Sequence, residues 1–411
     1  ETSDERYEVL FGDGIFGKKL KSGNLIKMSY IKTDGKNGNG ANIFNFAGTV
    51  KDDSGADANS IQTTLTTRIP SENGDDIESV QSVRNYAPRR YSAQNRAVTA
   101  SDYEAILPSL YPNIESVSAF GGEDLNPPQY GRVFIAAKPR NGNFLANSTK
   151  ISLLKSLKSY SVAGIVPSFI DLKFLYVELD SYIYYNPNFV GNPLSLQSQV
   201  VDSINQYKSS GELNKFGGRF KYSNVLSLID AVDVSITSNI TTVLIRRNLK
   251  ASINVFTQYE LCFDNEFYRK EDAYNIKSTG FSVSGVNGTV YLADQTIEGS
   301  DIGSIFLFKV TNATEVEIVT PNFGTVDYKK GEILLNTVNI TSTLKPENIV
   351  EIQAVPLSND VLGRKELYLQ LSMDNSNFTM RQDLIASGAN VSGTRFDPQS
   401  SYSNGSKVRG A

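Results

Sequence analysis

The sequence contains no histidine, no tryptophan and a single cysteine, Cys262. Without histidine the chain cannot form a Ser-His-Asp triad, a Cys-His dyad or a histidine metal site. A single cysteine excludes an intrachain disulfide and a cysteine-rich metal site. The lack of tryptophan also argues against a sugar-binding groove. These absences remove most common catalytic and metal-binding arrangements before any motif is considered.

Charge and hydropathy narrow the range of partners. The chain has 40 Lys and Arg against 44 Asp and Glu, a formal net charge of -4, which is unlike the basic footprint of a nucleic-acid binder. No apolar run approaches the roughly 18 residues of a membrane span, and the start of the chain shows no signal-peptide pattern. We therefore expect neither nucleic acid nor membrane as a partner. The chain begins with Glu1 rather than methionine, so we expect it to be part of a longer polypeptide that lacks its N-terminal part here.

The pattern along the 411 residues predicts a multidomain α+β protein. Residues 1–85 form a β-rich segment, and residues 86–250 mix helices and strands in an order that suggests a split βαβ module of the ferredoxin-like type. Residues 251–371 are nearly all strand-like and suit a sandwich or meander. Residues 372–411 are rich in Ser, Asn and Gly and are expected to be partly flexible.

Local signals place several of the elements. In the first segment we expect strands over residues 7–11 and 24–31. Ser101 and Glu104 match a capping box for a helix over residues 102–107, and Pro108 is expected to end that helix.

One motif, Gly12-Asp13-Gly14-Ile15-Phe16-Gly17, reads as G-x-G-x-x-G after a strand. A dinucleotide site needs a helix directly after the glycines, whereas here a second turn and another strand are expected. A kinase glycine-rich loop would need an H-R-D catalytic loop, which a chain without histidine lacks. The motif is therefore predicted to be a tight β-turn.

The other candidates for chemistry are weaker. Asp34 and the polar turn at residues 37–40 lack the spacing and the closing glutamate of a calcium loop. The acid pairs at residues 75–76 and 123–124 are all that favours a carboxylate-based hydrolase, because sequence neighbours do not show the separation that such chemistry needs. Cys262 lies in an alternating strand pattern and is predicted to be a structural thiol. We predict no catalytic residue, no cofactor and no metal.

Aromatic residues are the remaining unusual feature, with 21 Tyr and 21 Phe. Tyr176, Tyr182, Tyr184 and Tyr185 lie on one long β stretch, on which alternate residues point to opposite faces. Since tyrosine is enriched at protein interfaces, one face could meet a partner. The alternative is a sheet that is covered on both faces within one domain.

Two segments resemble the baseplate J-like family. Residues 11–17 resemble its F-G-D-G-x-x-G turn, and after a β segment Ala87-Pro88 and residues 96–104 resemble its AP…RAVT-x-x-DY signature. In length, composition and β-rich C-terminal portion the chain looks most like the baseplate wedge subunits of T-even-type contractile-tailed bacteriophages. The residues that carry the motifs are Phe11, Gly12, Asp13, Gly14, Gly17, Pro88, Arg96, Ala97, Val98, Thr99, Asp102 and Tyr103.

The resemblance implies a non-enzymatic assembly protein of the virion, located in the tail baseplate and assembled in the host cytoplasm. Such subunits pair as homodimers, join other wedge subunits in a ring around the hub, and couple host recognition to sheath contraction. The motif residues are expected to serve folding: the glycines allow unusual backbone angles, and Thr99 or Ser101 caps the helix that Asp102 enters. The alternative is a peripheral tail adhesin or fibre protein, commonly trimeric, that binds a host-surface receptor.

Overall fold

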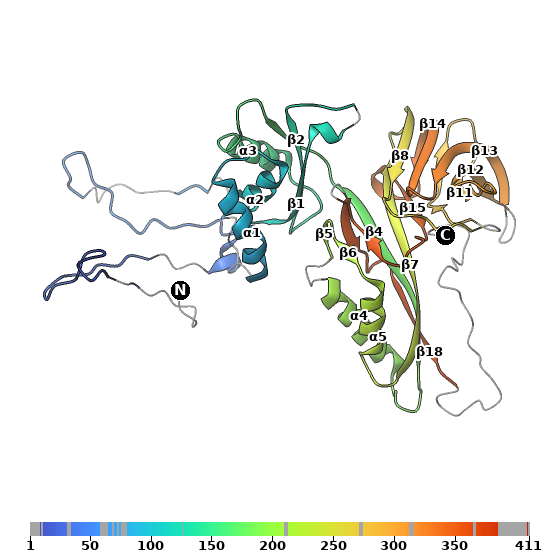
Figure 1. Ribbon diagram of the computed structural model, residues 1–411, viewed down its shortest axis with the longest axis horizontal. Helices are drawn as coiled ribbons and strands as arrows, with labels where there is room; N and C mark the ends of the chain where they lie inside the picture. Colours follow the sequence, from blue (N-terminus) through green and yellow to red (C-terminus); the bar gives the residue numbers. More distant parts are fainter. Residues whose placement is uncertain are drawn as a thin grey trace. The chain divides into compact units, whose positions relative to one another are not determined.

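The chain divides into two compact units, residues 1–79 and residues 80–411, and each is described by itself. The computed structural model (Figure 1) describes residues 9, 11–30, 34–57, 65–67, 70–71, 74, 80–125, 127–208, 213–270, 274–311, 316–364, 367–384 and 409.

The described residues of the first unit form turns and extended backbone rather than a sheet. They contain one short 3-10 helix, η1 (Gly35–Gly38), and one isolated bridge between Lys51 and Asp57. The expected strand over residues 24–31 is wrong for its described residues 24–30, which form no ladder. A strand needs a neighbour and a covered face, whereas Leu25 and Tyr30 are 96% and 88% exposed. Most of the strand expected at residues 7–11 lies outside the described residues.

Hydrogen bonds connect two extended stretches of this unit. The Gly40 amide donates to the Ser71 carbonyl at 2.7 Å, and the Ser71 amide donates to the Ala41 carbonyl at 2.9 Å. The Asn39 side chain accepts from the Gly74 amide at 2.7 Å and donates to the Gly74 carbonyl at 2.8 Å. The polar turn that contains Asn39 thus joins the two stretches through its own side chain.

The second unit starts with helices α1 (Val80–Ala93) and α2 (Ala100–Leu110), which are followed by a three-stranded sheet. Its strands β1 (Ile114–Gly121) and β2 (Arg132–Pro139) are antiparallel, and β3 (Val166–Phe169) runs parallel to β2. The 3-10 helix η2 (Gly122–Asp124) follows β1, and α3 (Asn147–Leu157) precedes β3. Buried side chains of α2, α3 and the sheet form a separate small core, which includes Tyr103, Leu107, Ile135 and Leu157.

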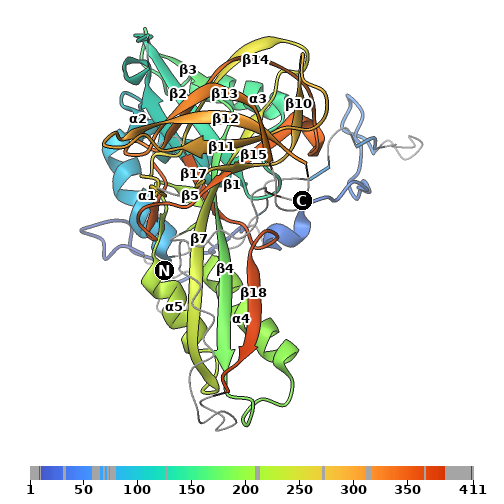
Figure 2. The ribbon, with the colours of Figure 1, turned by 90° about the vertical axis from the view of Figure 1, so that its right-hand side faces the viewer.

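A seven-stranded sheet forms the centre of the second unit, in the order β5-β17-β4-β7-β15-β9, with β18 also paired to β4. Helices α4 (Pro193–Lys208) and α5 (Tyr222–Asp230) lie along one face of the long strands (Figure 2), and their apolar positions point into the core. The strands are β4 (Lys173–Tyr185), β5 (Lys215–Phe216), β7 (Ile236–Lys250), β9 (Lys277–Ser278), β15 (Ile349–Ala354), β17 (Leu367–Leu371) and β18 (Asn377–Gln382).

A six-stranded antiparallel sheet is inserted in the chain between β7 and β15. A separate two-stranded ladder joins β6 (Arg219–Phe220) and β16 (Val361–Leu362), and the 3-10 helix η3 (Pro346–Asn348) precedes β15. The six strands are β8 (Phe256–Cys262), β10 (Phe281–Val283), β11 (Tyr291–Gln295), β12 (Ile302–Val310), β13 (Val316–Asp327) and β14 (Glu332–Thr343).

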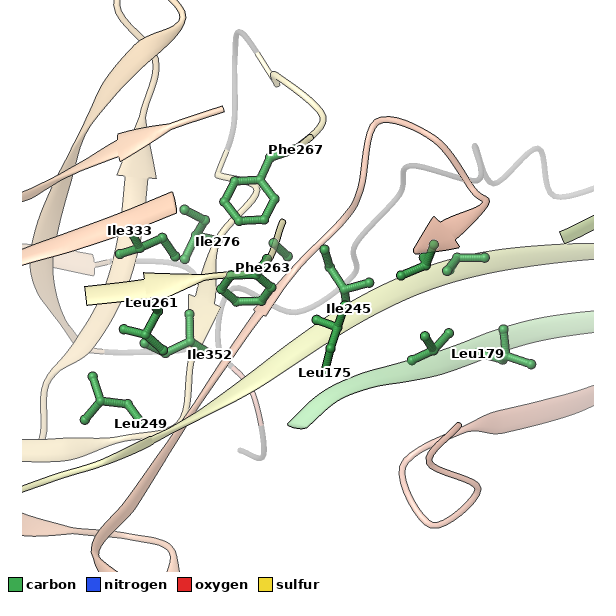
Figure 3. Close-up of a cluster of buried hydrophobic side chains, with 14 of the residues drawn as sticks. Leu175, Leu179, Ile245, Leu249, Leu261, Phe263, Phe267, Ile276, Ile333 and Ile352 are labelled. Atoms are coloured by element: carbon green, nitrogen blue, oxygen red, sulfur yellow. The ribbon is translucent and has the colours of Figure 1, made fainter. Parts of the chain in front are cut away.

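One continuous apolar core joins the six- and seven-stranded sheets. Figure 3 shows Leu261 and Ile333 of the six-stranded sheet in the same cluster as Ile245 and Ile352 of the seven-stranded sheet. Phe263 lies between these sets, on the connection that leaves β8. Since β7 pairs with β15 along its last residues, strand pairing also crosses the boundary expected near residue 250.

The central segment is mixed α+β as expected, but the ferredoxin-like arrangement is not confirmed. The strands that were expected to form one module fall into two sheets, because β1 and β2 pair with β3 whereas β4 and β7 pair with each other. Within the expected C-terminal segment 372–411, β18 is a regular strand that pairs in parallel with β4. The remainder of that segment lies outside the described residues, except for residues 372–376, 383–384 and Arg409.

Candidate functional site: family motifs and assembly surfaces

The glycine motif of the first unit forms a tight turn. Gly14 and Gly17 have φ values of 99° and 91°, and a Cβ on Gly12 would overlap the backbone of Gly17. The Asp13 carboxylate accepts hydrogen bonds of 2.8 Å from the amides of Ile15 and Phe16. These bonds, that of Phe16 first, lower the pKa of Asp13. The motif residues therefore stabilise the turn.

The same turn carries apolar side chains that face solvent. Ile15 and Phe16 are 83% and 86% exposed, and Phe11 beside them is also exposed. Further exposed apolar residues of this unit are Leu25, Met28, Tyr30, Ile43, Phe44 and Phe46. An accumulation of exposed large apolar side chains is typical of a surface that binds another protein.

The second motif lies at the start of α2 and contributes Ala97 and Tyr103 to the small core. The Ala97 amide donates to the Tyr160 carbonyl at 2.8 Å, and Tyr103, fully buried, donates from its hydroxyl to Ser161 Oγ at 3.1 Å. The motif therefore attaches the start of α2 to the segment that follows α3. Ala97 and Tyr103 are buried, whereas Arg96 and Val98 are exposed.

The start of α2 is capped by Thr99, one of the two residues expected, and not by Ser101. Thr99 is the N-cap, and Asp102 Oδ2 accepts from the amides of Val98 at 3.0 Å and Thr99 at 2.8 Å. Ser101 lies inside the helix, and the helix continues past Pro108 to Leu110. The expected Ser101–Glu104 box and the expected end at Pro108 are therefore wrong. Burial works to raise the pKa of Asp102, but the two amides outweigh it and the pKa is lowered.

Glu104 has a different role. Its Oε1 accepts from the Ala119 amide at 2.9 Å and so links α2 to β1. Pro88 lies inside α1 on an exposed position, in a helix that the sequence analysis did not expect. The signal for α1 was weak because proline is disfavoured in helix interiors.

The tyrosines of β4 are largely covered within the chain. Tyr184 and Tyr185 are buried, and Tyr176 and Tyr182 are half-buried. The Arg246 guanidinium lies 4.0 Å from the centre of the Tyr176 ring, and the Arg381 guanidinium lies 4.1 Å from that of Tyr182. Of the two alternatives left open by the sequence, the geometry favours a sheet covered by its own domain.

The sequence analysis missed an apolar surface at one end of the seven-stranded sheet. Phe189 and Leu194 follow β4 and Val234 precedes β7, and they are 73%, 72% and 97% exposed. A hydrogen bond of 2.9 Å from the Asn186 amide to the Ser235 carbonyl holds the two loops together. We call these three residues the sheet-end patch; it lies at the end of β4 and β7 away from the six-stranded sheet (Figure 1). For Phe189 and Val234 the available signal was an apolar residue inside a loop, where polar side chains are usual, whereas Leu194 is the second residue of α4.

Among the described residues, one group of side chains resembles a set of metal ligands. Cys262 of β8 lies beside Glu260 and Glu332, with Sγ to carboxylate distances of 3.6 Å and 4.0 Å. Burial first, and then the nearby carboxylates, raise the pKa of Cys262 to about 11. The thiol is therefore protonated at neutral pH and is not a ready nucleophile.

The two acid pairs, which were the candidates for a hydrolase, show no catalytic arrangement in the described residues. Residues 75–76 lie outside the described residues, and residues 123–124 form part of η2. None of the helices in the described part of the chain is long and apolar enough to cross a membrane.

Comparison with known proteins matches two regions of the chain. One contains most of the second motif, and the other contains the long strands β4 and β7. A family described as "Baseplate structural protein gp6, C-terminal domain I" matches residues 99–170, and "C-terminal domain III" of the same protein matches residues 173–248. The chain is baseplate wedge-like. The break between the two matches coincides with the passage from the three-stranded sheet, which ends at Phe169, to the seven-stranded sheet, which starts at Lys173.

The chain also resembles a baseplate wedge protein whose identity is known. Baseplate wedge protein gp6 of Enterobacteria phage T4 is 27% identical over 267 residues, which cover 61% of this wedge-like chain and 40% of the relative. The chain thus spans well under half of that relative. A cryo-EM structure of the anti-feeding prophage baseplate, 6-fold symmetrised, is similar at 17% identity with a TM-score of 0.30, over 43% of this chain and 40% of that chain.

Proposed function

We propose that this chain is a structural subunit of a contractile-tail baseplate. The observation that carries the proposal is the pair of consecutive gp6 domain matches, whose shared boundary falls where one sheet ends and the next begins. The matched families are described as structural, and the residues that could suggest chemistry are used in turns, caps and strand surfaces.

The architecture suits such a role physically. A continuous core through two sheets gives a body that transmits force without internal sliding. The exposed apolar side chains of the first unit and of the sheet-end patch supply surfaces on which partners can bury area.

The finer part of the proposal is the assembly. The subunit pairs with a second copy, the pairs join other wedge subunits in a ring around the hub, and the ring couples host recognition to sheath contraction. The protein would be located in the virion, in the tail baseplate, after assembly in the host cytoplasm. The motif residues in both units would act as folding elements in this scheme rather than as contact residues.

Sedimentation velocity of the full 411-residue chain over a hundredfold concentration range tests the self-contact. We expect a discrete dimer. A strict monomer over the whole range would show that these residues contain no self-contact, and a stable trimer would favour the adhesin.

Paired variants locate the contact. Ile15→Asp/Phe16→Asp changes the first unit, and Phe189→Asp/Val234→Asp changes the sheet-end patch; one pair should raise the dimer Kd by about tenfold or more. Ile297→Asp is the matched control, because Ile297 is an exposed apolar residue in the loop between β11 and β12. If all three variants retain the wild-type Kd, neither apolar surface forms the contact.

A further inference from the structure

A buried cluster of charged side chains crosses three neighbouring strands of the seven-stranded sheet. Glu178 on β4 and Glu351 on β15 lie diagonally across from Arg246 on β7, which pairs with both of the other strands. Arg246 Nε donates to Glu178 Oε1 at 2.6 Å, and Arg246 Nη1 lies 3.2 Å from Glu351 Oε1. Gln353 donates from Nε2 to Glu178 Oε2 at 2.8 Å.

The strands alone leave this cluster one positive charge short. Glu178 is fully buried and Glu351 nearly so, whereas Arg246 is the buried cation that the three strands contribute to them. Lys345 lies 3.8 Å from Glu351, but its side chain is 41% exposed, so solvent screens much of its charge. A buried carboxylate without a paired cation is strongly destabilising.

Arg409 supplies the second cation. Its Nη1 and Nη2 donate to the two oxygens of Glu178 at 2.6 Å and 2.8 Å, and its Nε donates to Glu351 Oε2 at 2.8 Å. The Arg409 side chain is only 10% exposed. Its backbone amide donates to the Ser278 carbonyl at 3.2 Å, on β9 at the end of the sheet order.

We propose that Glu178 and Glu351 form a guanidinium-binding site, and that Arg409 occupies it to fasten the C-terminal end of the chain to the sheet. The two carboxylates accept hydrogen bonds from all three nitrogens of one planar guanidinium group. This geometry fits a guanidinium better than an ammonium, which is a compact point charge. The hydrogen bond from the Arg409 backbone amide to the Ser278 carbonyl adds a contact at the edge strand β9, and proteins commonly cover such an edge. This inference rests on the cluster and does not depend on the baseplate role.

Removal and chemical replacement of the guanidinium test the site. Arg409→Ala in the full chain should lower the Tm by about 6 °C or more, because it leaves a buried carboxylate unpaired. Millimolar methylguanidinium should restore part of that loss, in proportion to the logarithm of its concentration, whereas tetramethylammonium at equal ionic strength should not. Arg409→Lys should be intermediate, since it keeps the charge and loses the fork.

Two controls make the result specific. Lys345→Ala removes a cation near the same Glu351 carboxylate and should leave the Tm within about 1 °C of the wild type. In Glu178→Gln/Arg409→Ala the effect of methylguanidinium should be lost. An unchanged Tm in Arg409→Ala, or a recovery that the two salts produce equally, would overturn the proposal.

Discussion

Truncation of one buried phenylalanine should destabilise the six-stranded and the seven-stranded sheet together. Phe263 and Phe267 are 0% and 2% exposed, and their rings meet edge to face with centroids 5.0 Å apart. Replacing a buried Phe by Ala costs about 3–5 kcal/mol, and losing an aromatic pair adds about 0.5–1.5 kcal/mol. We therefore expect Phe267→Ala to reduce the free energy of unfolding by about 4 kcal/mol, a large part of the roughly 5–15 kcal/mol typical of a domain.

The assay is urea unfolding followed by far-UV circular dichroism, together with hydrogen exchange read by mass spectrometry. The urea midpoint should fall with an unchanged m-value, and peptides from β4 and from β14 should lose protection by equal amounts. Phe256→Ala is the matched control, because Phe256 is 70% exposed on β8 and its removal should change stability by less than about 0.5 kcal/mol. If β14 peptides lose protection while β4 peptides keep the wild-type value, the continuous core does not couple the two sheets.

Three further outcomes follow from local contacts. Asp102→Ala should cost about 1 kcal/mol of unfolding free energy, because the Thr99 amide loses its acceptor, and Asp102→Asn should recover part of it in the same urea assay. Burial works to raise the pKa of Glu351, but Arg409 and other cations lower it overall, so its contribution to stability is present above the unfolded pKa and is lost as pH falls through the folded value. The difference in urea midpoint between wild type and Glu351→Gln should therefore shrink on acidification below about pH 4.5; a constant difference would contradict this. Cys262, with its pKa raised to about 11, should react slowly with iodoacetamide at pH 8 and faster as pH approaches that value, whereas the urea-unfolded chain should react readily at pH 8.

Sequence periodicity was most informative where one face of an element is buried. The long β stretch that carries the four tyrosines is β4, and the mixed segment expected over residues 86–250 also contains the amphipathic helix α4. Both elements have a regular apolar face that packs on the core, which is the condition under which periodicity and structure agree.

Elements whose formation depends on distant partners were not predictable in the same way. Residues 24–30 have a strand-like pattern, yet without a neighbouring strand they form no ladder. The split into two sheets also could not be read from the order of elements, because β17 and β18 from the end of the chain complete the sheet around β4. Pairing partners so far apart leave no trace in local composition.

The candidate site shows the same division between local and distant causes. The glycine turn at residues 12–17 was predicted as a turn because its backbone requirement is local. The cap was left open between Thr99 and Ser101, because both are good N-cap residues, and the structure has Thr99 in that position. The contact of Glu178 with Arg409 joins residues that are 231 positions apart, and no local pattern indicates it.

The distribution of apolar surface connects the fold to the proposed role. In the second unit the large apolar side chains of the two sheets are mostly buried in one core, and the sheet-end patch is an exception at the far end of β4 and β7. In the first unit, by contrast, the described apolar side chains are mostly exposed. Burial of apolar area stabilises by about 25 cal/mol per Å², so the apolar area of the second unit contributes to folding, whereas much of that of the first unit stays in contact with solvent and would be available to partners in the proposed role. A body whose core is complete can keep its fold while contacts at such surfaces form and break, which is the physical requirement for a subunit that must move between two arrangements of one assembly.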